Sequence, residues 1–204
     1  MATTTTTTRS ATLPALVYVL AAFGVISGAY GAVTSVNTAA TFVKPRDDYQ
    51  KLVDAGSERL KSLVGPAELD YITREAEARY ARRNAALPLA GIGLILSCLM
   101  FAGAMRAMRG DRWGLSAWSF SAAASIPYQL LNLALTGLMA RDLAKAVAEL
   151  PPMTQLIVGN AQMLASILFC AVAISYYGVC VIYLRTPTVR AAFSDGAART
   201  PPSA

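Results

Sequence analysis

Four long uncharged stretches dominate the chain, and polar segments of very different length separate them. The stretches cover residues 13–36, 85–105, 114–140 and 155–184. The first has 24 residues and, at 1.5 Å per residue, reaches about 36 Å as a helix, which exceeds the roughly 30 Å hydrocarbon core of a bilayer. The pattern predicts an all-α, polytopic membrane protein: a compact bundle of four transmembrane helices.

The polar segment 37–84 carries most of the charge. Between Phe42 and Arg83 lie nine basic and eight acidic residues of the 18 and 12 in the chain. Apolar side chains recur there at helical spacing on both sides of Gly65-Pro66, which predicts a small helical hairpin, placed outside the cytoplasm. The other segments are predicted to be a disordered Thr-rich tail, a short basic loop, a short amphipathic loop and a flexible tail, at 1–12, 106–113, 141–154 and 185–204.

The first stretch has a second interpretation as a cleaved signal peptide, since Arg9 precedes it and Ala29-Tyr30-Gly31 follows an apolar core. Its apolar region continues beyond the 7–15 residues usual for a signal, which favours an uncleaved span. Orientation is ambiguous: three arginines in the 106–113 loop favour cytoplasmic termini, whereas Arg82-Arg83 beside the second span oppose them. We expect both termini in the cytoplasm, and a bacterial plasma or inner membrane as the location.

Composition supports a membrane location and narrows the chemistry. Only 15% of the residues are charged, against about 25% in soluble domains. The net charge is +6, but its basic residues flank spans, so anionic lipid headgroups are expected partners and nucleic acid is not. Histidine is absent, the three cysteines lie in apolar stretches, and no catalytic or nucleotide-binding motif occurs. We therefore expect no cofactor, no metal and no enzymatic activity.

Small and polar residues form one stripe on each predicted span. Because lipid tails are as apolar as leucine, helices in a membrane associate through close contact and interhelical hydrogen bonds. Small residues that permit such contact recur in phase on spans one and two. The helix-packing set predicted from them is Gly24, Gly28, Gly31, Ala90 and Gly93.

The stripe on spans three and four contains side chains with stronger hydrogen-bonding groups. Its predicted members are Ser121, Ser125, Gln129, Asn132, Thr136, Gln162 and Ser166. Lipid cannot satisfy the amides of Gln129 and Asn132, so we expect these to face other helices. The stripe is either structural, joining helices, or a small polar pocket. Pro127 predicts a kink in span three.

Three classes of function fit these patterns unequally. A non-catalytic accessory, assembly or scaffold subunit needs only a packed bundle and an exposed hairpin, with a protein partner or a second copy. A small transporter or channel subunit could pass a neutral solute along the stripe, although no ionisable side chain occupies a span centre for proton coupling. An enzyme would have to use carboxylates of the small hairpin, such as Glu68 and Asp70. We expect the first class, with the second as the alternative.

Overall fold

The computed structural model describes residues 13–156 and 162–196 of the 204-residue chain. This part of the chain is helical and contains no strand, which confirms the all-α prediction for it. Its helices are α1 (Ala15–Phe42), α2 (Arg46–Leu60), α3 (Pro66–Ala81), α4 (Arg83–Met108), α5 (Arg112–Ala148), α6 (Pro152–Gln155), α7 (Gln162–Leu184) and α8 (Pro187–Gly196).

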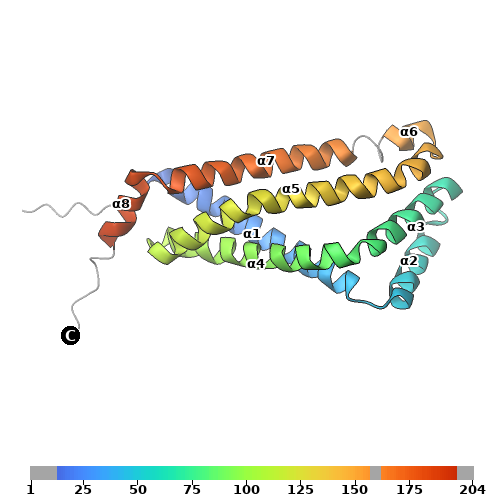
Figure 1. The fold of residues 1–204 in the computed structure, drawn as a ribbon, viewed down its shortest axis with the longest axis horizontal. Helices are drawn as coiled ribbons and strands as arrows, with labels where there is room; N and C mark the ends of the chain where they lie inside the picture. Colours follow the sequence, from blue (N-terminus) through green and yellow to red (C-terminus); the bar gives the residue numbers. More distant parts are fainter. Residues whose placement is uncertain (1–12, 157–161, 197–204) are drawn as a thin grey trace, which may run out of the picture.

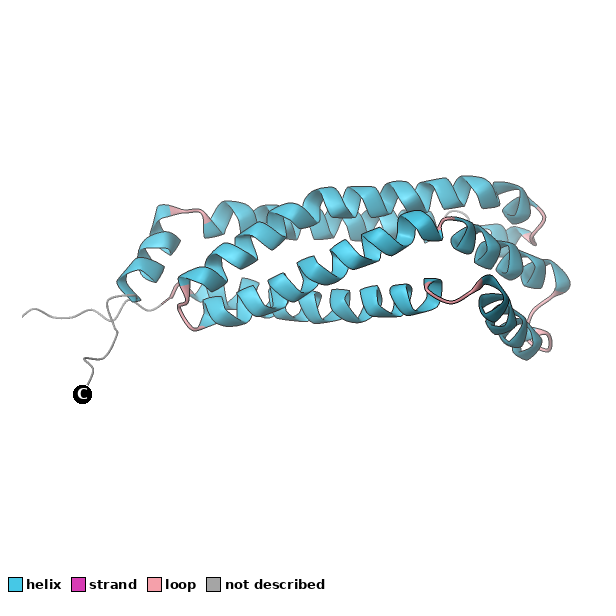
Figure 2. Cartoon of the chain, turned by 60° about the horizontal axis from the view of Figure 1, so that its bottom comes forward, coloured by secondary structure: helices cyan, strands magenta, loops and turns pink. Residues whose placement is uncertain are grey.

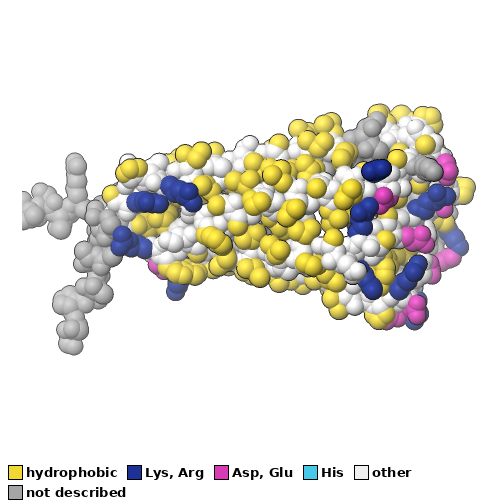
Figure 3. All heavy atoms as spheres, viewed as in Figure 1, with side chains coloured by type: hydrophobic (Ala, Val, Ile, Leu, Met, Phe, Trp, Pro, Cys, Tyr) yellow, Lys and Arg dark blue, Asp and Glu magenta, His cyan; other side chains and the backbone are white. Residues whose placement is uncertain are grey.

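The four longest helices lie side by side in an elongated array (Figures 1 and 2). α1 packs on α4, α4 on α5, and α5 on α7. α8 lies at one end of the array, while α2, α3 and α6 lie at the other (Figure 1). Apolar side chains cover the visible middle of the array, and charged ones gather at its ends (Figure 3).

Three of these helices are long and apolar enough to cross a membrane: α1, α4 and residues Met163–Leu184 of α7. The expected span at 114–140 lies within α5, which has 37 residues but is not among the three. Serines, Gln129 and Asn132 lower the hydropathy of this helix, and its last turns are charged. The described residues therefore contain three candidate spans by length and composition.

Glycines bring the backbones of α1 and α4 together. A Cβ atom at Gly28 would lie 2.8 Å from both the backbone nitrogen of Phe101 and the carbonyl oxygen of Ser97. At Gly31 it would collide with the Ser97 side chain. Contacts this short with backbone atoms cannot be relieved by turning a side chain, so α1 and α4 meet at this distance only where glycine removes the Cβ.

A second close crossing joins α4 to α5. A Cβ at Gly103 would lie 2.7 Å from the backbone nitrogen of Trp118, and one at Gly114 would lie 2.5 Å from that of Ala107. The turn between the helices contains Gly110, whose φ of +80° favours glycine. The Asp111 carboxylate then caps α5 by accepting a hydrogen bond of 2.9 Å from the Trp113 backbone N–H.

The main apolar core lies at the α8 end of the array. Trp118 is fully buried at its centre, among side chains of α1, α4, α5, α7 and α8 that include Val17, Ala104 and Leu184. Residues 185–204 were expected to be a flexible tail, but α8 occupies part of them and buries Phe193 in this core. The sequence did not predict α8 because its apolar pattern, Val189 followed four residues later by Phe193, is short and lies among Pro, Ser and Thr residues.

The opposite end forms a polar structure that we call the cap: α2, α3, residues 141–148 of α5, and α6. Here α5 continues as a helix to Ala148, where residues 141–154 were expected to be a loop. Tyr71 of α3 packs on Leu143, Ala146 and Leu150 in a second apolar cluster. This cluster explains the extension, since α3 covers the apolar face of the last turns of α5.

Ion pairs surround the cap cluster. Arg82 binds the Asp142 carboxylate and lies 3.4 Å from the Leu138 carbonyl oxygen. Arg74 lies 3.7 Å from Glu149. These contacts join residues near the start of α4 and within α3 to the end of α5. The cap is therefore attached to the array by side-chain contacts as well as by the connecting backbone.

We expect Gly28→Ala to lower the free energy of unfolding in detergent by about 1–3 kcal/mol, because the added methyl group forces α1 and α4 apart. Gly91→Ala is the matched control, because no heavy atom lies within 4 Å of a Cβ at Gly91. Thermal unfolding of the two purified variants measures the difference. Equal midpoints would show that the glycine contact does not hold these helices together.

Replacing Arg82 by Gln should loosen the cap. The Arg82 side chain is only 26% exposed, so its ion pair is less screened than an open surface pair, and a loss of about 1 kcal/mol is expected. Amide hydrogen exchange in α3 should then accelerate about fivefold. The control is Arg59→Gln, whose exposed side chain forms no ion pair within the described residues. The same acceleration in both variants would contradict a specific role for Arg82.

Candidate functional site: a polar groove between α5 and α7

The predicted stripe of span three lies along α5, with its members buried to different depths. Ser121 and Ser125 are buried, whereas Gln129, Asn132 and Thr136 are half-buried. Two hydroxyls are satisfied within the helix: Ser121 donates to the Trp118 carbonyl at 2.9 Å, and Thr136 donates to that of Asn132 at 2.9 Å. The hydroxyls of these two residues therefore donate hydrogen bonds within α5 and not to a neighbouring helix.

A groove of about 380 Å³ separates part of α5 from α7. Polar and apolar side chains alternate on its walls. On α5 they are Gln129, Leu133 and Thr136, and on α7 they are Ser166, Phe169 and Cys170. The Cys170 thiol donates a long hydrogen bond, 3.8 Å from sulfur to oxygen, to the Gln129 carbonyl. The groove is thus closed at the Cys170 level by direct contact of the two helices.

Tyr177 of α7 links the groove to the buried part of the stripe. Its hydroxyl lies close enough to the side chains of Gln129 and Ser125 to interact with both. The amide of Gln129 therefore faces another helix, as its chemistry requires in a lipid environment. The sequence does not show which stripe residues lie at the level of Tyr177, so this contact could not be predicted.

Tyr176, the residue before it, connects α7 to α1. Its hydroxyl donates a hydrogen bond of 2.9 Å to the Leu20 carbonyl. A Cβ at Gly24 would lie 3.2 Å from this hydroxyl and 3.1 Å from Nε1 of Trp118. Gly24 therefore leaves room for two aromatic side chains from two other helices. Trp118 Nε1 is buried without a hydrogen-bond partner within the described residues.

Tyr128 of α5 is inserted between α1 and α4. Its hydroxyl fills the space beside Gly93, where a side chain would collide with it, and Ser35 of α1 lies at 2.9 Å from the same Cβ position. Gly93 and the buried Ala90 lie on the face of α4 toward the array. Sequence reasoning missed Tyr128 and Trp118. Trp118 lies among Ser116, Ala117 and Ser119, a pattern that could have indicated a side chain inserted between helices, whereas Tyr128 carries no such signal.

The remaining predicted residues do not all reach the groove. Asn132 does not line it, and its amide makes no hydrogen bond within the described residues. The side chain of Gln162 lies outside the described part. Pro127 has an exposed side chain inside α5, which continues as one helix on both sides of it. The kink predicted from Pro127 stays a prediction.

The groove walls carry no ionisable acid or base. Their amide, hydroxyl and thiol groups can exchange hydrogen bonds with a neutral polar molecule or with one another, but cannot balance a charge. Among the described residues, no group of three or more His, Cys, Asp or Glu side chains is arranged to hold a metal ion.

A different pocket, of about 300 Å³, lies where the cap joins the array. The rings of Tyr49 and Tyr80 contact each other there in a tilted arrangement, with centroids 4.8 Å apart, and Arg83 lies over the Tyr80 ring. Tyr49 donates a hydrogen bond of 3.0 Å to the Ala76 carbonyl. Burial raises the pKa of the Tyr49 phenol, and the nearby Arg79 partly opposes this effect. These contacts fix the angle between α2 and α3.

The chain was compared with protein-family models, characterised proteins and solved structures. None of the three finds a match to the chain. The residues and their contacts are therefore the basis for a functional proposal.

Proposed function

We propose that the chain is an integral membrane protein with four spans, α5 being the fourth beside α1, α4 and α7. α5 packs between α4 and α7, so a bilayer that contains these two helices surrounds α5 as well. At 1.5 Å per residue its 37 residues extend about 55 Å, more than the roughly 30 Å that a crossing needs. The excess is the part of α5 that belongs to the cap.

We further propose that the α8 end faces the cytoplasm. Arg106, Arg109, Arg112, Arg185 and Arg190 lie at this end. The positive-inside rule counts basic residues in short segments next to spans, and these segments are short. The helical cap then lies on the other side of a bacterial plasma or inner membrane, although its own basic residues, with Arg82 and Arg83 beside α4 among them, count against this orientation.

The function that the geometry supports best is a non-catalytic accessory, assembly or scaffold subunit. The observation that carries this proposal is the attachment of the cap: α3 is held on the extension of α5 by the Tyr71 cluster and by Arg82 with Asp142. A fixed polar surface is thereby presented beyond the bilayer. On this surface Leu63 is 77% and Leu52 50% exposed, and such apolar side chains suit contact with a protein partner.

A second candidate is passage of a neutral solute between α5 and α7. It is favoured by the groove of about 380 Å³ with its Gln129, Thr136 and Ser166 side chains. Against it stand the direct contact of the Cys170 thiol with the Gln129 backbone carbonyl and the position of the Tyr177 hydroxyl close to the Gln129 side chain. We therefore assign the polar side chains of the groove mainly to holding α7 on α5.

The scaffold proposal predicts a discrete protein contact at the cap. A photo-crosslinking amino acid placed at Leu63 in cells should give one dominant protein adduct, whereas the same residue at Ile26, 66% exposed on α1, should give lipid adducts. Gel mobility and mass spectrometry of the adducts distinguish the two. A second copy as the Leu63 adduct would identify the partner as the chain itself. Absence of any discrete protein adduct at Leu63 would contradict the proposal.

The two candidates also differ in whether water enters the groove. In a variant without native cysteines, Thr136→Cys should react with a membrane-impermeant maleimide no faster than Leu168→Cys, a residue 57% exposed on α7. Liposomes containing the purified protein should take up small neutral solutes at the rate of empty liposomes. Fast labelling at position 136 together with solute uptake that Gln129→Leu abolishes would replace the scaffold proposal by the transport candidate.

A further inference from the structure

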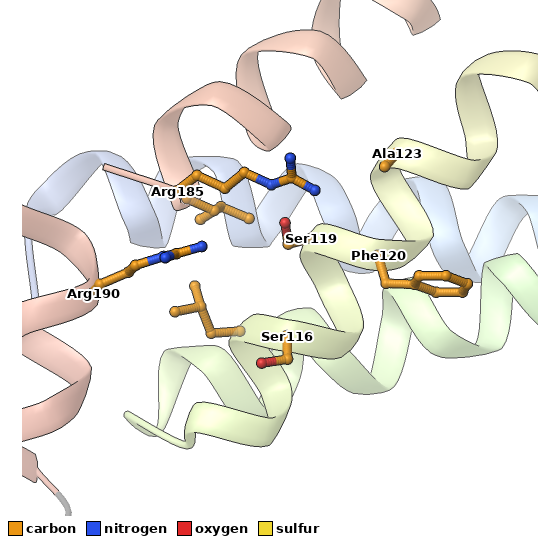
Figure 4. A pocket seen from close by; sticks show the side chains of 8 residues that line it. Ser116, Ser119, Phe120, Ala123, Arg185 and Arg190 are labelled. Atoms are coloured by element: carbon orange, nitrogen blue, oxygen red, sulfur yellow. The ribbon is translucent and has the colours of Figure 1, made fainter. Parts of the chain in front are cut away.

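A separate pocket, of about 310 Å³, lies where α5, the end of α7 and α8 meet (Figure 4). Arg185 follows the last residue of α7, and Arg190 belongs to α8. Both side chains extend into the pocket from different elements, toward the face of α5 that carries Ser116 and Ser119 (Figure 4). Two guanidinium groups and two hydroxyls therefore converge on one cavity.

No described side chain of the protein balances the charges of this pocket. Neither Arg185 nor Arg190 forms an ion pair within the described residues, and no acidic side chain lines the pocket. At the cap, by contrast, Arg74, Arg79 and Arg82 all have carboxylate partners. Two like charges directed into one cavity repel each other, so the arrangement favours an anion between them.

The fold fixes Arg190 in this position. On α8, Val189 and Phe193 are each 1% exposed and belong to the core around Trp118. Arg190 therefore follows directly after a residue that anchors the helix, and its backbone N–H donates to the Thr186 carbonyl at 3.1 Å. A solvated tail could place a charge anywhere, whereas this anchored helix places Arg190 over α5. The sequence of α8 also contains Asp195, whose side chain is outside the described part.

The chemistry of the donors matches a phosphate group. Guanidinium groups present paired N–H donors that fit the oxygens of phosphate, and serine hydroxyls can donate to the remaining oxygens. The pocket is also partly apolar: Phe120, 63% exposed, and Ala123 line it deeper along α5, toward the middle of the array. A free phosphate ion would make no favourable contact with this apolar part, whereas an acyl chain attached to a phosphate group would pack against it.

We infer that this pocket binds the phosphate group of an anionic phospholipid, with Arg185, Arg190, Ser116 and Ser119 around the headgroup and Phe120 and Ala123 along the start of an acyl chain. The site is independent of the scaffold proposal, because it lies at the opposite end of the array from the cap.

The test is a titration of the full chain in a neutral detergent with phosphatidylglycerol, followed by native mass spectrometry. We expect one tightly retained phosphatidylglycerol, and at least tenfold weaker retention in the double variant Arg185→Gln with Arg190→Gln. The control double variant is Arg109→Gln with Arg112→Gln, which removes the same charge from two exposed arginines at the same end that do not line the pocket. The control should change retention less than threefold.

A further comparison distinguishes the lipid from a free anion. Inorganic phosphate at millimolar concentration should not displace the lipid, and Phe120→Ala should weaken lipid retention several-fold. Displacement by inorganic phosphate, with no effect of Phe120→Ala, would overturn the lipid assignment in favour of a phosphate ion site. Equal weakening in the two double variants would overturn the site itself, because general attraction to positive charge would then explain the binding.

Ser116→Asp provides an independent variant that keeps both arginines. Ser116 is exposed, so the substitution leaves the core intact, and its carboxylate should occupy the guanidinium groups and repel phosphate. We expect it to weaken retention as strongly as the Arg185 and Arg190 double variant, with an unchanged unfolding temperature. Full retention in Ser116→Asp would contradict the proposed position of the headgroup.

Discussion

The arrangement of this protein depends on how closely its helix backbones approach one another. In a bilayer, apolar side chains gain nothing by leaving lipid for another helix, so association requires van der Waals contact at short range and hydrogen bonds between helices. Gly28 gives α1 that contact with α4, and Gly103 and Gly114 give it to α4 with α5. At Gly24 and Gly93 the space left by the glycine is instead filled by aromatic side chains of other helices, Trp118 with Tyr176 and Tyr128 respectively.

Tyrosine hydroxyls supply the directional part of the same packing. Tyr176 binds the Leu20 carbonyl of α1, and Tyr177 contacts Gln129 and Ser125 of α5. A tyrosine can do this from a lipid-facing helix because its ring is apolar and only its hydroxyl requires a partner. α7 is therefore held by two adjacent residues that point to two different helices, which fixes its rotation as well as its position.

The sequence predicted the helical class and the long apolar segments, because periodicity and charge depend only on the residues themselves. Small residues at Gly24, Gly28 and Gly93 indicated faces suited to close packing, since glycine in an apolar helix has few other uses. The partners of these glycines could not be predicted, because Trp118 and Tyr128 reach them only through the relative rotation of helices. The extension of α5 into the cap was also missed. Its apolar face, with Leu143 and Ala146, is buried only by contact with α3, and the sequence does not show this contact.

The unbroken course of α5 has a structural consequence. One helix carries the ion-paired Asp142 at one end, Gln129 in the middle and Ser116 at the other end. A single helix thus connects the residue that holds the cap to the residues that line the pocket at the α8 end, with no loop between them. The close contact of Gly103 with Trp118, two residues from Ser116, holds this end of α5 against α4, whereas Asp142 lies 24 residues further along the same helix.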